Sequence, residues 1–571
     1  MAKLDFQAKN LTADLTSAAV SGLIAIPDAI ASALLAGVSP TYAFNALMTG
    51  TPIGSLFTGS QFINIGLTSA MMLAVADVLA GMDAGDTLTA LFTLTLFIGV
   101  FQLILGLLKM GRFTRFISNT VMVGFLTGVA VVVILGQLGD LTGYKSGAGR
   151  TVTKAIDTLL HPGQWNLPSL AIGLATIILI LLFNRTRLRT FSVALGMIIT
   201  SVVVILGSAA GLPGLDSVAL IGDTNQISGS IPMPTLPDLS LIPSLALSAV
   251  AIGLIGLIQG SGVSQGVPNP DGEYPDASRD FLGQGIANIV SGSFQGLPLG
   301  GSVGGTGIVM STGAKSRWAN VFLGLFVGIF VLLFSGLVEA VAMPAVAGVL
   351  IVVGFGIINR ESIADVWDVH VSKRVIMLVT FFATLILPVQ QAILLGVFLS
   401  LIDYIYSSSA HVNLIALRPL DSGTFREETA PAILPDDSVT VLQARGSTYF
   451  AAARTIQDLL PEAKESQQAV VIMRMRGIDQ IGTTFISVME RYAAELRANG
   501  GRLMLSGVGE KVKAQLLRTE TTDSIPEDGI FMATEVLGDS TRAAMAAGEM
   551  WLATEHNGPD SISREEVEGV A

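Results

Sequence analysis

The sequence contains no cysteine and only four histidines among its 571 residues. Without cysteine the chain can form neither disulfides nor thiolate metal sites, and the histidines are scattered rather than clustered. Charged residues make up only 13% of the chain, and the excess of acidic ones gives a net charge of -12. We therefore expect no redox or zinc chemistry, no cofactor and no nucleic-acid partner, since phosphate binding requires a basic surface.

Hydrophobic residues, in contrast, make up 51% of the chain, and the mean hydropathy is +0.66. These values are typical of a membrane protein. The charges are unevenly distributed, because residues 412–571 hold 15 of the 32 Lys and Arg residues. The sequence therefore predicts a polytopic membrane domain over 1–411, a soluble domain over 412–555 and a disordered acidic tail over 556–571.

About fourteen apolar runs lie between residues 10 and 410, and several are shorter than the roughly 20 residues that a helical span needs. Two runs, 59–75 and 294–311, are interrupted by glycine, proline or polar residues, and one lies in each half. The second includes GLPLGGSVGGTGIVM (296–310), which has six glycines. Paired interruptions of this kind indicate a transporter built from two inverted repeats, with the binding site at the breaks.

The distribution of basic residues predicts the orientation in the membrane. With the N-terminus inside, the expected cytoplasmic loops hold fourteen Lys and Arg residues and the expected outer loops hold three. By the positive-inside rule, both termini and the soluble domain lie in the cytoplasm of a multi-pass protein of the inner cell membrane. The first apolar run is too long for a cleavable signal peptide.

The soluble part has strand-like runs at 438–446, 468–476 and 502–507, with an amphipathic helix over 483–501. This order predicts a small α/β domain. Together with the turn RGIDQIG (476–482), it resembles the STAS domain of bacterial anti-sigma-factor antagonists, which also ends many anion permeases. The antagonists carry a phosphorylatable serine in an Asp-Ser-Ser-Gly turn. The matching residues here are Asp479, Gln480, Ile481 and Gly482, so we expect that switch to be absent, although the domain could still bind a cytoplasmic partner.

Three stretches of the membrane part resemble the sulfate permease (SulP) family. They are IPDAIASALLAGVSPTYAF (26–44), INIGLTSAM (63–71) and GQGIANIVSGSFQGLPLGGSVGGTGIVMSTGAKSRWANV (283–321). The resemblance implies a mainly α membrane protein, with 14 transmembrane segments in a 7+7 inverted repeat that includes two half-helices. It also implies a homodimer that is not an enzyme and that carries small anions, such as sulfate, bicarbonate, chloride or dicarboxylates, by elevator-type movement.

Two half-helices that meet near the midplane can hold an anion with free N–H groups and positive dipole ends. We expect one half-helix to open at Gly66, Leu67 and Thr68, and the other at Ser302, Val303, Gly304 and Gly305. The alternative is that the glycines only allow helices to pack closely, as small residues do throughout membrane proteins.

At several positions the sequence departs from the family pattern that it resembles. It has Asp28 where many members have Gln, and Ser32 where they have Tyr. In the eighth segment it has Gln259 where family members have an acidic residue. In the tenth segment it has Gly305, directly before Thr306, where family members have Arg. The predicted substrate site has therefore gained one acid, lost another and lost its nearby cation.

Asp28 is the most informative of these residues, because an ionisable residue within a span is costly and usually functional. We expect it to bind a coupling proton or sodium ion, which predicts cation-coupled symport. The alternative is that Asp28 caps a helix that restarts after Pro27. Asp77, Glu339 and Asp403 are expected near the ends of their segments. The acidic stretch 269–280 is expected to be a solvated connector.

Other classes of membrane protein are less compatible with the sequence. A nucleobase-type permease would share the membrane fold, but Gln259 and Gly305 occupy positions where that family keeps acids. A second alternative is a non-transporting scaffold or motor in which the STAS domain recruits partners. The sequence does not exclude it, because the Arg at the predicted substrate site is missing. An ATP-driven pump is excluded by the absence of a G-x-x-x-x-G-K-[ST] motif.

Overall fold

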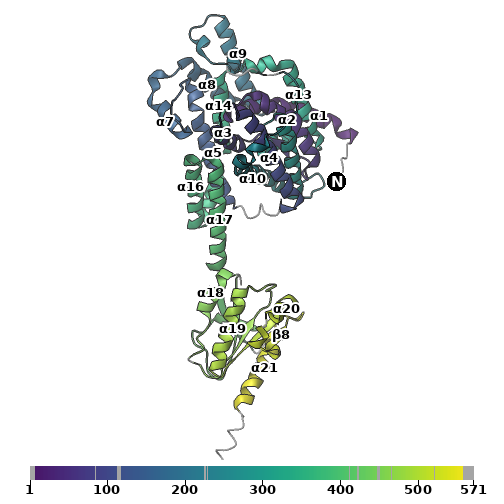
Figure 1. The fold of residues 1–571 in the computed structure, drawn as a ribbon, viewed down its shortest axis with the longest axis vertical. Helices are drawn as coiled ribbons and strands as arrows, with labels where there is room; N and C mark the ends of the chain where they lie inside the picture. The colour runs from purple at the N-terminus through teal and green to yellow at the C-terminus, as the bar shows by residue number, and fades with distance from the viewer. Residues whose placement is uncertain are drawn as a thin grey trace, which may run out of the picture. The chain divides into compact units, whose positions relative to one another are not determined.

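The computed structural model describes residues 7–83, 85–111, 118–223, 227, 229–410, 412–420, 424–446, 450–464, 466–519 and 521–556. Of the predicted acidic tail (556–571), residues 557–571 lie outside these described residues. The chain divides into two compact units, Met1–Ser400 and Leu401–Ala571. The first is helical apart from two short strands, and the second is an α/β domain (Figure 1).

The first half of the helical unit contains α1 (Leu11–Leu35), α2 (Pro40–Phe57), β1 (Asn64–Gly66), α3 (Ser69–Leu79), α4 (Thr87–Leu107), α5 (Asn119–Gly136), α6 (Leu138–Thr142), α7 (Thr151–Leu160), α8 (Leu167–Asn184) and α9 (Ser192–Ala209). The second contains α10 (Ile242–Gly266), α11 (Ala277–Ser293), β2 (Gly300–Ser302), α12 (Val303–Ser311), α13 (Trp318–Glu339), α14 (Met343–Ile357), α15 (Arg360–Val369), α16 (Val371–Ile386) and α17 (Val389–Ala410). Each half begins with two long helices, a three-residue strand and a short helix, as the repeat pattern predicts. Within the described residues, eight helical stretches are long and apolar enough to cross a membrane.

The two interrupted segments lie side by side, because β1 and β2 form an antiparallel pair. Asn64 lies opposite Ser302, Ile65 opposite Gly301 and Gly66 opposite Gly300. Extended backbone in a membrane protein needs hydrogen-bond partners within the protein, and here each interruption provides them for the other. The pairing therefore places the N-termini of α3 and α12 next to each other.

Some of the glycines in the second interruption are required for packing. A Cβ atom on Gly301 would lie 2.2 Å from the Cα atom of Gly260 in α10, and one on Gly300 would lie 2.7 Å from Met71 Sδ. No side chain fits between the backbones of β2 and α10 at this distance. For these two glycines the packing interpretation is confirmed.

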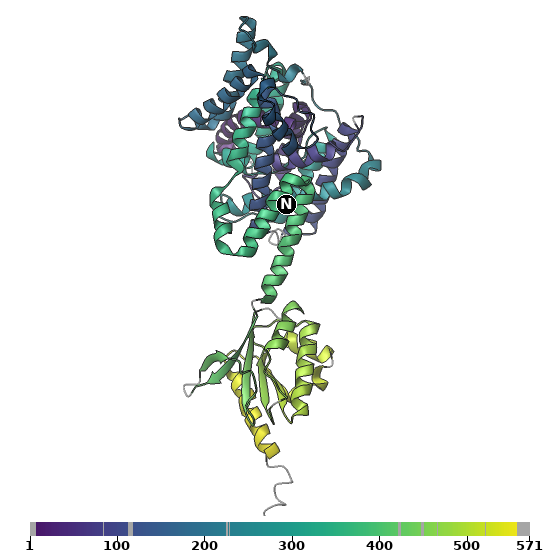
Figure 2. The same cartoon turned by 90° about the vertical axis from the view of Figure 1, so that its left-hand side faces the viewer.

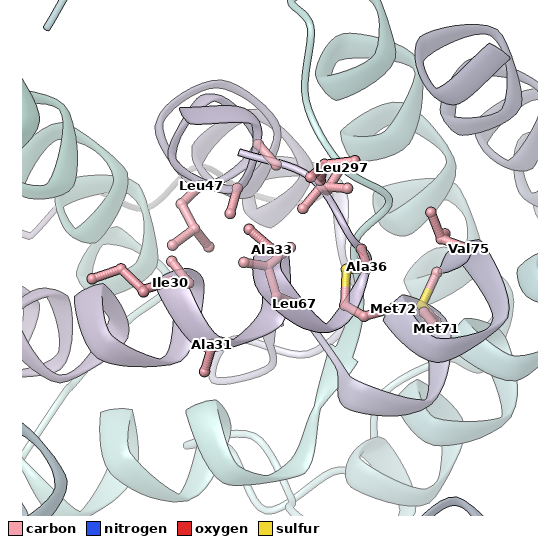
Figure 3. Close-up of a cluster of buried hydrophobic side chains, with 14 of the residues drawn as sticks. Ile30, Ala31, Ala33, Ala36, Leu47, Leu67, Met71, Met72, Val75 and Leu297 are labelled. Atoms are coloured by element: carbon pink, nitrogen blue, oxygen red, sulfur yellow. The ribbon is translucent and has the colours of Figure 1, made fainter. Parts of the chain in front are cut away.

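Helix α1 packs against the start of α3 through small and branched apolar residues. Figure 3 shows Ala33 of α1 beside Leu67, and both belong to one buried cluster with Ile30 and Met71. The cluster continues into α2 and α13, which lie beside α1 (Figure 1). Helix α1 runs without interruption through Pro27, so Asp28 lies inside the helix and does not cap a restarted one.

The acidic stretch 269–280 is not simply a solvated connector. Asp280 is completely buried, and its carboxylate accepts hydrogen bonds from the N–H groups of Gly59 and Ser60, both at 3.0 Å, and from Ser264 Oγ. The solvated interpretation is therefore wrong for Asp280. It failed because the two N–H groups that bind this carboxylate lie about 220 residues away along the chain.

Other charged side chains of the helical unit also bind backbone groups. Asp77 Oδ2 accepts from the N–H of Val389 at 2.7 Å, where α17 begins, and Glu339, which ends α13, accepts from the N–H of Ile227 at 2.8 Å. The buried guanidinium of Arg317 donates to three carbonyl oxygens at the end of α2. These residues stabilise helix ends and connections.

The second unit contains β3 (Asn413–Pro419), β4 (Phe425–Thr429), β5 (Val439–Arg445), α18 (Phe450–Leu459), β6 (Val470–Arg474), α19 (Thr483–Ala498), β7 (Arg502–Val508), α20 (Glu510–Arg518), β8 (Ile530–Met532) and α21 (Asp539–His556). The sheet order is β4-β3-β5-β6-β7-β8, and β5 to β8 are parallel. Alternate residues of β6 enter two cores. Val471 and Met473 pack with α19, and Val470 and Ile472 pack with α21 on the opposite face (Figure 2). The predicted α/β domain is confirmed.

Candidate functional site

A cavity of about 700 Å³ lies where the N-termini of α3 and α12 meet. The other walls come from α1, α5, α10 and α14. Polar residues in the lining are Ser21, Asp28, Asn64, Thr68, Ser69, Asn119, Thr127, Gln259, Ser302, Asn359 and Ser362. The cavity is much larger than a small anion, so a ligand would enter it together with water.

Most of the residues that the sequence indicated line this cavity. They are Asp28, Gly66, Leu67, Thr68, Gln259, Ser302, Val303, Gly304 and Gly305. Ser32 and Thr306 are buried and do not line it. Thr306 has a structural role instead, since its Oγ1 accepts from the N–H of Asn64 at 2.9 Å and donates to the carbonyl oxygen of Ser302.

The N-terminus of α3 is open toward the cavity. Thr68 is its N-cap residue, but its side chain makes no capping bond, and Thr68 Oγ1 is buried with no partner among the described residues. The N–H groups of Ser69 and Ala70 likewise have no acceptor in the part of the chain that the structure describes. These unpaired donors carry the positive end of the helix dipole.

The N-terminus of α12 is capped in part. The N–H of Gly305 donates to Ser302 Oγ at 3.0 Å, so this donor is already used. The N–H groups of Val303 and Gly304 have no acceptor in the described ranges. A Cβ atom added to Gly304 would meet no described atom within 4 Å, which means that its backbone is accessible from the cavity.

The electrostatic character of the cavity is set by helix ends and one acid. None of the described lining residues is Lys, Arg or His, and Asp28 is the only ionisable one. The Asp28 side chain is exposed, and in the described structure it makes no hydrogen bond or ion pair. The positive potential therefore comes from the backbone, and Asp28 adds a negative charge on the α1 side.

The structure also explains why Gly305 is not a cationic residue here. A Cβ atom at this position would lie 2.4 Å from Asn64 Oδ1. The Asn64 side chain cannot move away freely, because its Nδ2 donates to Asn320 Oδ1 at 2.8 Å. Asn64 thus fills the space into which a longer side chain at 305 would extend.

Residues on α5 and around α15 were missed by the sequence reasoning. Asn119 and Thr127 of α5, together with Asn359 and Ser362, form polar parts of the wall. Asn359 caps α15 by accepting from the N–H of Ser362 at 3.1 Å. Polar residues inside or next to apolar runs were the available signal, but periodicity alone does not tell which face they occupy.

The comparisons with known proteins agree with this architecture. Bicarbonate transporter BicA of Synechocystis sp. is 23% identical over 587 residues, which cover 98% of each chain. Sulfate transporter 4.1, chloroplastic, of Arabidopsis thaliana is 21% identical over 548 residues, covering 91% of this chain and 78% of its own. The solved structure of SLC26A9 has a TM-score of 0.80 at 15% identity, covering 96% of this chain and 92% of that one.

Two family models match the chain. The STAS domain matches residues 430–535, and the Sulfate permease family matches residues 11–380. The second match covers more than half of the chain, and members of this family are membrane transporters rather than enzymes. This chain belongs to the Sulfate permease family and carries a C-terminal STAS domain.

Proposed function

We propose that this protein is a secondary active transporter of small anions of the sulfate, bicarbonate or dicarboxylate class. The observation that carries the proposal is the cavity at which unpaired N–H groups of two helix N-termini meet. Such groups bind anions without a basic side chain. The family membership and relatives named as sulfate and bicarbonate transporters support it.

The substrate site moves across the membrane in an elevator-type cycle. In support of this, residues of both halves are bonded into one block around the site. Strand β1 pairs with β2, and Asn64 is bonded to both Thr306 and Asn320. Helices α5 and α14 form the facing wall of the cavity. Because these elements are bonded to one another, the block can move as a unit against that wall.

Asp28 couples transport to a proton or a sodium ion. An anion at the two helix ends would be repelled by this carboxylate unless a cation or proton compensates its charge. We expect Asp28→Asn to abolish the proton or sodium dependence of uptake in proteoliposomes. Unchanged dependence in that variant would show that coupling resides elsewhere.

The protein acts as a homodimer in the inner cell membrane, with both termini cytoplasmic and with the STAS domain available to a cytoplasmic partner. Uptake of radiolabelled sulfate, bicarbonate and fumarate into proteoliposomes tests the transport proposal, with empty liposomes as the control. A non-transporting scaffold or motor would move none of them. A nucleobase-type permease would take up a labelled nucleobase instead, and the family match gives that alternative no support.

A further inference from the structure

Hydrogen-bond donors and the one ionic acceptor lie on different walls of the cavity. The donors are N–H groups of Ser69, Ala70, Val303 and Gly304 at the two helix ends. The acceptor is the carboxylate of Asp28 on α1, a helix that contacts both α3 and α12. Asp28 is therefore the charged group that shares the cavity with an anion bound to the N–H groups, among the described lining residues.

A carboxylate beside a bound anion distinguishes anions by whether they carry a hydrogen. If the facing oxygen of the anion has no hydrogen, two acceptors meet and repel. If that oxygen carries a hydrogen, it donates to the carboxylate and forms a charge-assisted hydrogen bond, which is among the strongest kinds. No described cationic side chain in the lining offsets the repulsion in the first case.

We propose that Asp28 makes the site selective for oxyanions that carry a hydroxyl group, such as hydrogencarbonate, hydrogenphosphate and singly protonated dicarboxylates. Oxyanions without one, such as sulfate and nitrate, bind weakly. The inference rests on the proposed anion transport and names the substrate class of the same cavity.

Asp28 lies within a regular part of α1. Its neighbours in sequence, Ala29 and Ile30, are completely buried, and α1 continues regularly on both sides. The other polar side chains beside the helix ends, such as Thr68 and Gln259, are uncharged. Asp28 is therefore the charged acceptor among the described lining residues.

Two matched pairs of anions test the inference in proteoliposomes. Hydrogencarbonate and nitrate are planar monoanions, and hydrogenphosphate and sulfate are tetrahedral dianions, so within each pair only one member carries a hydroxyl group. Each of the four anions is tested as an inhibitor of the uptake of labelled bicarbonate, at one slightly alkaline pH. A site built around a substrate hydroxyl rejects the analogue without it, so we expect the hydroxyl-bearing member to inhibit at least about tenfold more strongly.

Asp28→Asn provides the specific variant, because an amide can both donate and accept. We expect the preference within each pair to fall to about twofold or less in this variant, since the repulsion is lost. Asp368→Asn is the matched control, as Asp368 is exposed on α15 and does not line the cavity. It should keep the preference of the wild type.

The outcomes separate this inference from the proposed function. If the wild type takes up bicarbonate but sulfate and nitrate inhibit as well as their partners, the selectivity inference is wrong and transport stands. If the wild type takes up no anion, the proposed function itself is wrong. If Asp28→Asn does not fold, the thermal stabilisation of the wild-type protein by hydrogenphosphate is compared with its stabilisation by sulfate. Equal stabilisation by the two anions overturns the inference.

Discussion

The side-chain amide of Asn64 donates to Asn320 Oδ1 at 2.8 Å, which ties the strand before α3 to helix α13 in the other half of the unit. Asn320 in turn donates through Nδ2 to the carbonyl oxygen of Ile63 at 3.1 Å. Both asparagines are buried. These two hydrogen bonds hold the backbone of residues 63 and 64, where Asn64 lines the cavity.

We expect Asn320→Leu to destabilise the protein. The substitution leaves the Asn64 amide and the Ile63 carbonyl without a partner, and each buried unpaired group costs about 1 to 3 kcal/mol. Thermal unfolding of the purified protein in detergent measures the effect. Asn320→Asp keeps an acceptor for Asn64, but its buried carboxyl group would face the carbonyl oxygens of Phe62 and Ile63, so this variant should lose stability as well. An unchanged melting temperature for Asn320→Leu would contradict the structural role of the pair.

The glycines of the second interruption should differ in their tolerance of a methyl group. In Gly301→Ala the new Cβ would lie 2.2 Å from Gly260 Cα, so the backbones of β2 and α10 must separate. We expect a loss of about 1 to 3 kcal/mol or failure to fold, as for other overpacked cores. In Gly304→Ala the Cβ meets no described atom within 4 Å, and stability should be close to that of the wild type. Equal melting temperatures of the two variants would refute this distinction.

The caps of the two half-helices should contribute unequally to stability. Ser302→Ala removes the acceptor of the Gly305 N–H, and loss of an N-cap bond costs about 0.5 to 2 kcal/mol. Thr68→Val removes a hydroxyl that caps nothing and has no partner in the described residues, so it should be neutral or slightly stabilising. Chemical or thermal unfolding compares the two. A larger loss in Thr68→Val would mean that the hydroxyl has a partner in the folded protein.

The buried carboxylate of Asp280 should matter more than its exposed neighbours. Asp280→Asn weakens the bonds to the N–H groups of Gly59 and Ser60, and hydrogen bonds to charged groups contribute about 1.5 to 3 kcal/mol each. Asp271→Asn, in the same acidic stretch, is the control because Asp271 is exposed and should change stability by less than about 0.5 kcal/mol. A similar small effect of both substitutions would contradict the anchoring role of Asp280.

In the STAS domain, Tyr492 should resist ionisation. Burial and then the charge of Glu495 raise the pKa of its phenol, and its hydroxyl donates to the carbonyl oxygen of Pro461 at 3.0 Å. Because the raised pKa keeps the folded phenol neutral, its contribution to stability is complete below the ordinary tyrosine pKa and declines at more alkaline pH. An ultraviolet titration of the full protein should show one more late-ionising tyrosine than Tyr492→Phe. If Tyr492→Phe instead lost amplitude in the ordinary tyrosine range and kept all of the late-ionising amplitude, the shift would be disproved.

Much of the architecture could be predicted because it depends on local pattern. The apolar runs, the two interrupted segments and the strands of the STAS domain follow from hydropathy and periodicity over short windows. The roles of single polar residues could not be predicted in this way. Asp280 reads as part of a solvated stretch, yet it is buried against distant backbone. The guanidinium of Arg317 is also buried against distant backbone.

The candidate site was predicted in outline and refined by the fold. Gly300 and Gly304 look alike in the sequence, but Gly300 packs against α10 and Gly304 faces the cavity. Ser32 and Thr306 belong to the same motifs as Asp28 and Gly305, but they lie outside the lining. Such differences depend on which neighbour a residue meets, and sequence spacing does not specify that neighbour.

The amino-acid sequence by itself determined the membrane character of the first unit, the separate α/β domain and the two places where apolar segments break, because each depends on composition and short-range periodicity. Only the tertiary structure decided that the two breaks pair with each other and which N–H groups stay free. The partners are remote: the N–H of Asn64 bonds to Thr306, 242 residues away. A hydrogen bond depends on atoms that meet in space, and chain packing brings these together.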